Sequence, residues 1–400
     1  MKKTIIIILF ALVLTASGAF AITSGSTLIT TDTSGTTSLA SQFSNGLTLG
    51  YVKEGSSEVG VIAWSPDWRA GPWGLGLDFN IPLGGDRPNN IQNIVFRYAE
   101  YDDGAKGLRY GVLDNVTLGH GLIMSNYTTR NVNYTILNNE QMGLRGFYNW
   151  DIYGASAMGT YSHVYYVAAE ERVFPRLTLT EYYVTDADGV NIMQTDGTTK
   201  LFPAQSGFGV DATVPIVPGW DLYAEAGQLV GHGNAYGAGT GWAFNLLGVA
   251  SASFSFTYRM LDSGFVPEYF NIEYESNPVD LTSAEAGNTS KNGYLGTFAV
   301  NLANRVEGSI TYEDYTDTNP ALNGLASAIL SDQISATGYY SQPNFASFRS
   351  VSLEEGAIIG GSVTYKLNPA TNVTVHYKKA YNSDLGRVEE TQYYEIGIAF

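Results

Sequence analysis

The sequence predicts an all-β protein, a single antiparallel transmembrane β-barrel of about 16 strands within a range of about 14–18. Apolar and polar residues alternate with period two in many short segments, which is typical of strands with one apolar and one polar face. Short turns that carry Asn or Pro alternate along the chain with long polar stretches. After residues 1–21, no stretch is apolar over the roughly 18 residues that a membrane-spanning helix needs.

The clearest internal strand is predicted at residues 251–259. Phe254, Phe256 and Tyr258 fall on one face of this segment, and Arg259 falls on the other face with serines and a threonine. In a barrel the first face meets lipid and the second meets water in the lumen. Similar alternation predicts strands at many other places, including residues 269–274, 294–302, 306–313 and 373–378.

Chain length sets the expected number of strands. A tilted spanning strand with its share of turn and loop uses roughly 22–26 residues, which leads to about 16 strands. Long loops are expected at residues 185–206, 262–292, 314–334, 342–356 and 381–390. A barrel of this width is too wide to be filled by its own side chains, so the lumen should hold water.

The N-terminal residues predict export from the cytoplasm. Lys2 and Lys3 precede an apolar stretch, and Ala19-Phe20-Ala21 has the small residues of a cleavage site. We therefore expect residues 1–21 to be a signal peptide and residues 22–400 to form one barrel domain without a linker.

The composition is acidic and lacks cysteine. The chain carries 21 Lys and Arg against 38 Asp and Glu, a net charge of −17. This balance argues against a nucleic-acid partner and favours a weak attraction for cations. The four histidines are scattered without zinc spacing, and the acidic loops lack an ordered ligand pattern. No cofactor and no metal site are therefore expected.

The last strand of the chain is the most informative segment. Tyr394, Ile396, Ile398 and Phe400 form an apolar face that continues to the final residue. This pattern resembles the closing-strand signal of Gram-negative outer-membrane β-barrels, although no motif matches a particular porin family. The resemblance implies short periplasmic turns, long extracellular loops, contact with outer-membrane lipid and recognition by the barrel-assembly machinery. For porins it also implies a homotrimer.

Several charged residues fall on predicted lumen-facing positions. They are Arg97, Arg109, Arg145, Asp211, Asp221, Glu225, Arg259, Glu307 and Glu313. Facing basic and acidic residues could set the selectivity of a pore. The same residues could instead form ion pairs across neighbouring strands and keep the lumen hydrated, without setting its selectivity. Both interpretations are compatible with a pore.

The segment 115–127 is rich in glycine and contains Gly119-His120-Gly121, a pattern repeated around His232. One interpretation is a constriction loop inside the barrel, with His120, Ser125, Asn126 and His232 as its candidate residues. A kinked strand and two ordinary glycine-rich turns are the alternatives. A serine nucleophile needs a His within hydrogen-bond distance to activate its hydroxyl. His120 and Ser125 are five residues apart and would lie on opposite faces of a strand, so they could not form this hydrogen bond. No catalytic residues and no enzyme are therefore expected.

Together these features predict an outer-membrane channel for passive diffusion of small hydrophilic solutes, with a weak preference for cations. One alternative is a substrate-specific transporter or exporter of a sugar, a polysaccharide or a lipid. Another is a surface-anchoring or adhesive barrel with a closed lumen. Aromatic residues near the ends of predicted strands are typical of girdles at the two lipid–water interfaces. The alternative is a row of rings that stack on sugars, for which residues 265–270 are the candidate.

Overall fold

The architecture is described from a computed structural model of the chain. It describes residues 42–44, 46–54, 57–64, 66–83, 94–129, 141–174, 176–193, 199–246, 249–275, 278–281, 289–303, 305–345, 357–368, 371–382 and 387–399. The predicted signal peptide and Phe400 lie outside the described residues. Within these ranges, no helix has the length and apolar character to cross a membrane.

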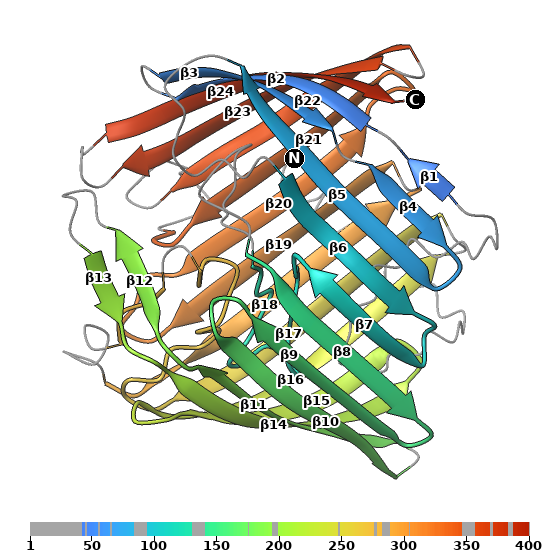
Figure 1. The fold of residues 1–400 in the computed structure, drawn as a ribbon. Helices are drawn as coiled ribbons and strands as arrows, with labels where there is room; N and C mark the ends of the chain where they lie inside the picture. Colours follow the sequence, from blue (N-terminus) through green and yellow to red (C-terminus); the bar gives the residue numbers. More distant parts are fainter. Residues whose placement is uncertain are drawn as a thin grey trace.

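The described residues form a 22-stranded antiparallel sheet and a separate two-stranded hairpin (Figure 1). The first strands are β1 (Gln42–Ser44), β2 (Gly46–Glu54), β3 (Ser57–Trp64), β4 (Asp67–Ala70), β5 (Trp73–Leu83), β6 (Ile94–Asp102), β7 (Lys106–Gly111) and β8 (Gly143–Trp150). The next are β9 (Tyr153–Thr160), β10 (Val164–Phe174), β11 (Leu177–Asp186), β12 (Val190–Met193), β13 (Thr199–Phe202), β14 (Ser206–Val217), β15 (Trp220–Leu229) and β16 (Gly233–Leu246). The last are β17 (Ala250–Leu261), β18 (Lys291–Leu302), β19 (Val306–Tyr315), β20 (Ala321–Ile329), β21 (Ile334–Gln342), β22 (Ile358–Asn368), β23 (Thr371–Asn382) and β24 (Arg387–Ala399).

Neighbours in sequence are neighbours in the sheet along most of the chain. From β5 onward each strand pairs antiparallel with the next, except that β11 pairs with β14 and leaves β12–β13 as a separate hairpin. β24 pairs with β23 on one edge and with β2 on the other, with Leu47 opposite Ile398. Because β2 in turn pairs with β3, the first long strand lies beside the last one.

The all-β antiparallel prediction is confirmed, but the prediction of about 16 strands is wrong. Two reasons are visible in the connections. The stretch 314–334, expected to be a loop, contains β20, and β21 starts at its end. Several turns at one end of the sheet contain only a few residues, such as 151–152 and 218–219, so each strand uses less chain than assumed. The predicted strand at 269–274 is not a strand, because this segment folds into the interior.

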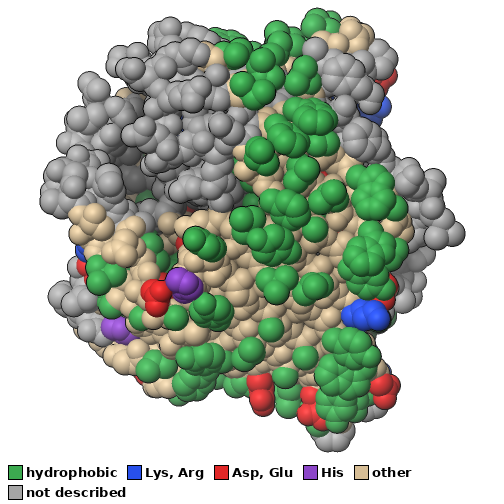
Figure 2. Space-filling view, viewed as in Figure 1, with side chains coloured by type: hydrophobic (Ala, Val, Ile, Leu, Met, Phe, Trp, Pro, Cys, Tyr) green, Lys and Arg blue, Asp and Glu red, His purple; other side chains and the backbone are tan. Residues whose placement is uncertain are grey.

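The two faces of the sheet differ in polarity, in the sense opposite to a soluble protein. On β17, Phe254, Phe256 and Tyr258 are exposed, whereas Thr257 and Arg259 are buried. The same alternation places large exposed apolar side chains on strands around the sheet. Figure 2 shows such hydrophobic side chains spread over the strands facing the viewer, with charged side chains mainly toward the margins. The outer face of the sheet is thus apolar, and polar and charged side chains lie on its inner face.

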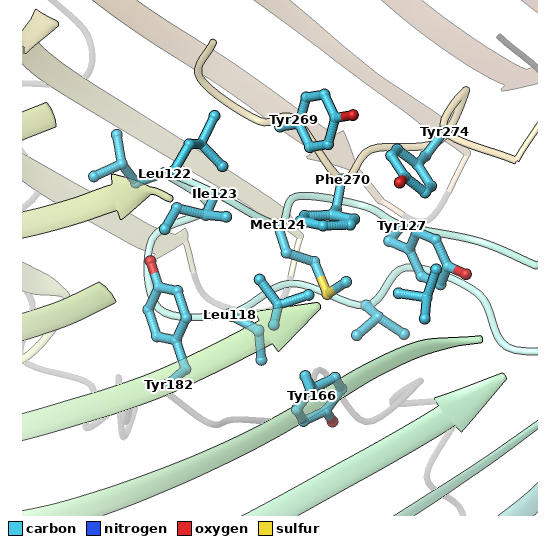
Figure 3. Packing of buried hydrophobic residues seen from close by; sticks show 14 of the residues in the cluster. Leu118, Leu122, Ile123, Met124, Tyr127, Tyr166, Tyr182, Tyr269, Phe270 and Tyr274 are labelled. Carbon is cyan, nitrogen blue, oxygen red and sulfur yellow. The ribbon is translucent and has the colours of Figure 1, made fainter. Parts of the chain in front are cut away.

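Two connections fold into the space enclosed by the strands. They are residues 112–129, between β7 and β8, and residues 262–275 with 278–281, between β17 and β18, called here the first and second inward segments. They touch through backbone hydrogen bonds, since Phe270 N donates to Ile123 O at 3.0 Å and Ser125 N donates to Phe270 O at 3.0 Å. Figure 3 shows Met124 and Phe270 side by side, with Tyr166 and Tyr182 from the strands beneath them. The apolar core therefore lies inside, against the wall formed by β9–β17.

Replacing Phe270 by Ala should loosen both inward segments. Phe270 is 0 % exposed in the core cluster, so the substitution leaves a cavity that should cost about 3–5 kcal/mol. Hydrogen exchange of the amides at 122–125 should become faster, while exchange of the wall strands should not. Leu201→Ala, at an exposed position of β13, is the control and should leave these amides protected. Equal exchange in the two variants would contradict this account of the core.

Candidate solute passage and its inward segments

The first inward segment can turn because its glycines adopt positive φ. Gly119 has φ +56° and Gly121 has φ +89°, a region that favours glycine. Val116 and Tyr127 exchange backbone hydrogen bonds at 2.9 Å, which closes the segment on itself. A Cβ on Gly119 would lie 2.0 Å from Asp211 Oδ2, so the segment can approach the wall only without a side chain here.

His120 attaches this segment to the wall. Its Nδ1 lies 3.0 Å from Asp211 Oδ1, and its backbone N–H donates to the same oxygen at 3.1 Å. Its ring stacks on Tyr223 with centroids 3.7 Å apart and an interplanar angle of 6°. The sequence predicted His120 for a constriction loop and Asp211 for the lumen-facing wall, and the structure brings the two side chains together.

The other residues predicted for the constriction loop occupy different positions. Ser125 lies in the first inward segment, where its backbone N–H bonds to the second segment. Asn126 has φ +51° and its N–H donates to Thr117 Oγ1 at 2.9 Å. His232 lies in the turn between β15 and β16, where its N–H donates to Leu229 O. It is not part of either inward segment.

Arg259 joins the wall to the second inward segment. Its side chain is 0 % exposed; Nε donates to Glu225 Oε1 at 2.8 Å and Nη1 to Glu268 Oε1 at 3.1 Å. Glu225 and Arg259 flank Gly237 in the register of β15, β16 and β17. A Cβ on Gly237 would lie 2.5 Å from Glu225 Oε1, so the glycine leaves the space through which this ion pair forms.

The three predicted arginines of the first half lie on adjacent strands β6, β7 and β8. Arg97 Nη2 donates to Asp67 Oδ2 at 3.0 Å, and Arg109 Nη1 donates to Glu100 Oε2 at 2.8 Å. Arg145 lies directly opposite Arg109, and its Nε donates to the Tyr166 hydroxyl at 3.0 Å. Arg109 therefore bonds to the adjacent strand β6, whereas Arg97 and Arg145 each bond to a strand two positions away, β4 and β10.

Two partners in this group were missed from sequence. Asp67 belongs to β4, a strand too short to show alternation. Glu100 is bonded by both Arg69 and Arg109. The Tyr98 hydroxyl also donates to Asp67, at 2.7 Å, so two residues adjacent in sequence, Arg97 and Tyr98, bond to the same carboxylate. A register shift between β5 and β6 brings both side chains to this carboxylate.

Of the remaining predicted lumen residues, Glu313 lies close enough to Arg259 and Glu268 to interact with their charges. Glu307 accepts a hydrogen bond from Ser327 at 3.0 Å, and Asp221 lies opposite Gly241 on β16. Glu313 lies opposite Leu295 on β18 and on the face of β19 that carries Glu307. Among the described residues, no group of three or more His, Cys, Asp or Glu side chains could hold a metal ion.

The closing strand has the predicted outward face. Tyr394 and Ile396 are exposed, and Ile398 occupies the next position of the same alternation in the backbone of β24. Phe400 lies outside the described residues.

The second inward segment is also fixed by carboxylates. Glu275 accepts hydrogen bonds from the Tyr127 hydroxyl and from Ser162 Oγ, the latter at 2.6 Å. The Tyr274 hydroxyl donates to Asp186 Oδ2 at 2.7 Å. Burial raises the pKa of the Glu275 carboxyl above its ordinary value, although the two hydroxyl donors oppose this rise.

The inward segments divide the interior into two unlike halves. Side chains on the inner face of β9–β17, such as Tyr166, Leu229 and Arg259, are buried beneath them. On the inner face of β20–β22, by contrast, Asn323, Thr337 and Tyr339 are exposed. The exposed inner face is called here the open wall, and it is the candidate passage for a solute.

Comparison with known proteins gives distant structural matches. No family model and no curated protein matches the sequence. The structure is similar to crystal structures of Pseudomonas aeruginosa OccK11 (OpdR), with a TM-score of 0.44, and Acinetobacter baumannii OccAB2, with a TM-score of 0.42. It is also similar to a BenF-like porin from Pseudomonas fluorescens, with a TM-score of 0.41. Identity is 10 % in each case, with 90 % of this chain covered and 96 %, 97 % and 98 % of the other chains.

Replacing Arg259 by Met should destabilise the folded protein by about 3–5 kcal/mol, because it leaves Glu225 buried without its cation. Urea unfolding in detergent measures this loss. The double variant Arg259→Met with Glu225→Gln should recover part of the stability, since the fully buried carboxylate is then neutral and the remaining partner, Glu268, is 30 % exposed. If the double variant were less stable than the single one, the pairing would not be the cause.

Docking of the second inward segment should weaken as the pH rises. Because the pKa of Glu275 is raised in the folded state, the protonated carboxyl contributes stability that is fully present below the unfolded value of about 4.5. That contribution is lost as the pH rises through the folded pKa. Amide exchange at Phe270, measured from acidic to mildly alkaline pH, should show this change.

Glu275→Gln should remove the pH dependence, because glutamine keeps the acceptor oxygen but does not titrate in this range. Glu273→Gln changes an exposed glutamate two residues away and should keep the dependence of the parent protein. If the pH dependence of amide exchange at Phe270 were the same in Glu275→Gln as in the parent protein, another titrating group would be responsible for it.

Proposed function

We propose that the protein is an outer-membrane channel through which small hydrophilic solutes diffuse, with a weak preference for cations. The observation that carries the proposal is the reversed polarity of the sheet. Apolar side chains such as Phe254 and Ile310 are exposed, while Arg259, Glu225 and Asp211 are buried inside. A sheet with this arrangement suits hydrocarbon outside and water inside.

Aromatic side chains support a membrane position with two boundaries. All six tryptophans lie toward the end of the sheet where short turns join the strands: Trp64, Trp68, Trp73, Trp150, Trp220 and Trp242. Exposed tyrosines such as Tyr165, Tyr236 and Tyr258 lie toward the end with the long connections. Girdles of Trp and Tyr are typical of the two lipid–water interfaces.

The interior supports passive passage of polar solutes. Its open wall carries hydroxyl and amide side chains, including the paired Thr337 and Ser362. The weak cation preference follows from the acidic chain, whose net charge of −17 becomes more negative if a leader with two lysines is removed. The arginines on β6–β8 oppose this preference, but their salt bridges to Asp67 and Glu100 offset part of their charge.

A substrate-specific transporter is the second candidate. The inward segments fill one side of the interior with an apolar cluster, and this narrowing would suit selection among solutes better than free diffusion.

Export through a signal peptide at residues 1–21, assembly through the closing strand and a homotrimer remain parts of the proposal.

Planar-bilayer recording of the purified chain tests the proposal. Steady, large conductance steps with a reversal potential biased toward cations are the expected result. Small steps that a solute can block would favour the transporter, and the absence of conductance after insertion would favour an anchoring barrel with a closed lumen.

A charge on the outer face should impair membrane insertion. Ile310 is 51 % exposed near the middle of β19, so Ile310→Arg should destabilise the inserted state by about 2–4 kcal/mol. Ser309→Arg, one residue earlier on the inner face, is the matched control and should insert normally. Urea titration of folding into lipid vesicles measures both. Equal destabilisation of the two variants would argue against lipid on the outer face.

A further inference from the structure

Strand register places polar side chains on the open wall and on the inner faces of the neighbouring strands β18, β19 and β23. Thr297 and Thr311 pair across β18 and β19, with their hydroxyls 3.2 Å apart. Ser341 donates to Asn323 at 2.7 Å across β20 and β21. Further along, Thr364 and Thr374 pair at 2.9 Å. The wall therefore presents hydroxyl and amide groups at successive strands.

Tyr339 interrupts this polar surface with an aromatic ring. Tyr339 lies opposite Leu325 on β20 and opposite Gly360 on β22. A Cβ on Gly360 would lie 2.4 Å from Tyr339 Cζ, so the ring lies across the glycine backbone. The glycine supplies the space that keeps the ring against the wall.

Other tyrosine rings also lie against glycines on neighbouring strands, but these tyrosines are buried. Tyr98, Tyr182, Tyr223 and Tyr315 each lie within 3 Å of a Cβ built on such a glycine, and they are 4 %, 4 %, 9 % and 7 % exposed. Tyr339 is 39 % exposed. Among these five tyrosines, it alone offers an accessible ring to a solute.

The surroundings of this ring indicate the chemistry that it can bind. Leu325 beside it is exposed, and Thr337, Ser341 and Ser362 provide hydroxyls on the same face. None of these four side chains carries a charge, and the Lys378 cation lies one strand further on, opposite Gly360 on β23. An aromatic ring with hydroxyl groups beside it suits a solute with one apolar face and a rim of hydroxyls.

We infer that the open wall holds a binding site for neutral cyclic sugars, with the Tyr339 ring stacking on the sugar and the surrounding hydroxyls bonding its rim. This inference rests on the proposed channel function and names its solute class. Residues 265–270, the alternative sugar-stacking segment considered from sequence, do not form this site, because Phe265, Tyr269 and Phe270 are buried in the core cluster.

Maltose added to the channel in a planar bilayer tests the site. Ion current should fall with maltose concentration and reach a plateau, because a bound sugar occupies the passage. Tyr339→Ala should raise the half-blocking concentration several-fold or abolish the block, while Tyr339→Phe should keep it because the ring remains. Tyr294→Ala is the matched control, since Tyr294 has a similar exposure of 47 % on the outer face and should leave the block unchanged.

Current recorded before sugar is added shows that each variant has folded and inserted. A conducting channel that maltose does not block, or that maltose blocks equally in the parent and in Tyr339→Ala, would overturn the inference and leave the channel proposal standing. Equal block by sorbitol, an acyclic polyol without a ring face, would also overturn it. A parent chain that inserts without conducting would reject the channel function itself.

Discussion

Backbone hydrogen bonding and side-chain alternation act together on every long strand of this protein. A strand in an apolar environment must pair on both edges, because unpaired N–H and C=O groups have no water to bind. The pairing of β2 with both β3 and β24 meets this requirement at the two ends of the chain. Alternation then directs every second side chain outward, so the same strands present an apolar outer surface and a polar interior.

A wide polar interior creates a packing problem, which the inward segments solve on one side only. Their apolar residues form a core against β9–β17, and their polar attachments bond to ionisable groups of the wall. His120 binds Asp211, and Glu268 binds Arg259, which is itself paired with Glu225. Glycines make these approaches possible, as at Gly119 and Gly237, where a side chain would collide with a carboxylate. The opposite wall stays accessible, and that asymmetry is the basis for the proposed solute path.

Several features of the fold could be predicted because they depend on local periodicity. The strand at 251–259 has the predicted apolar face, with Phe254, Phe256 and Tyr258 exposed, but Arg259 on its polar face is buried rather than in contact with water. The strands β18 and β19 lie where alternation placed them. β20 was missed because its sequence, ALNGLASAI, mixes small and apolar residues on both faces. Residues 269–274 were mistaken for a strand because buried aromatic residues in an irregular segment can imitate alternation. Lumen charges were found individually, but Asp67 and Glu100, their partners, were not.

The sequence alone determined which residues can share a face of a strand, since period two is a property of the extended backbone itself. It also determined the apolar surface, the acidic charge and the glycines that permit sharp turns. Tertiary structure decided which strands lie side by side and which segments enter the interior. Contacts such as His120 with Asp211, 91 residues apart, depend on register and on the path of long connections, which local pattern does not encode. The exposure of Tyr339 and the burial of Tyr182 have the same origin, because two tyrosines with equivalent glycine neighbours differ only in what covers them.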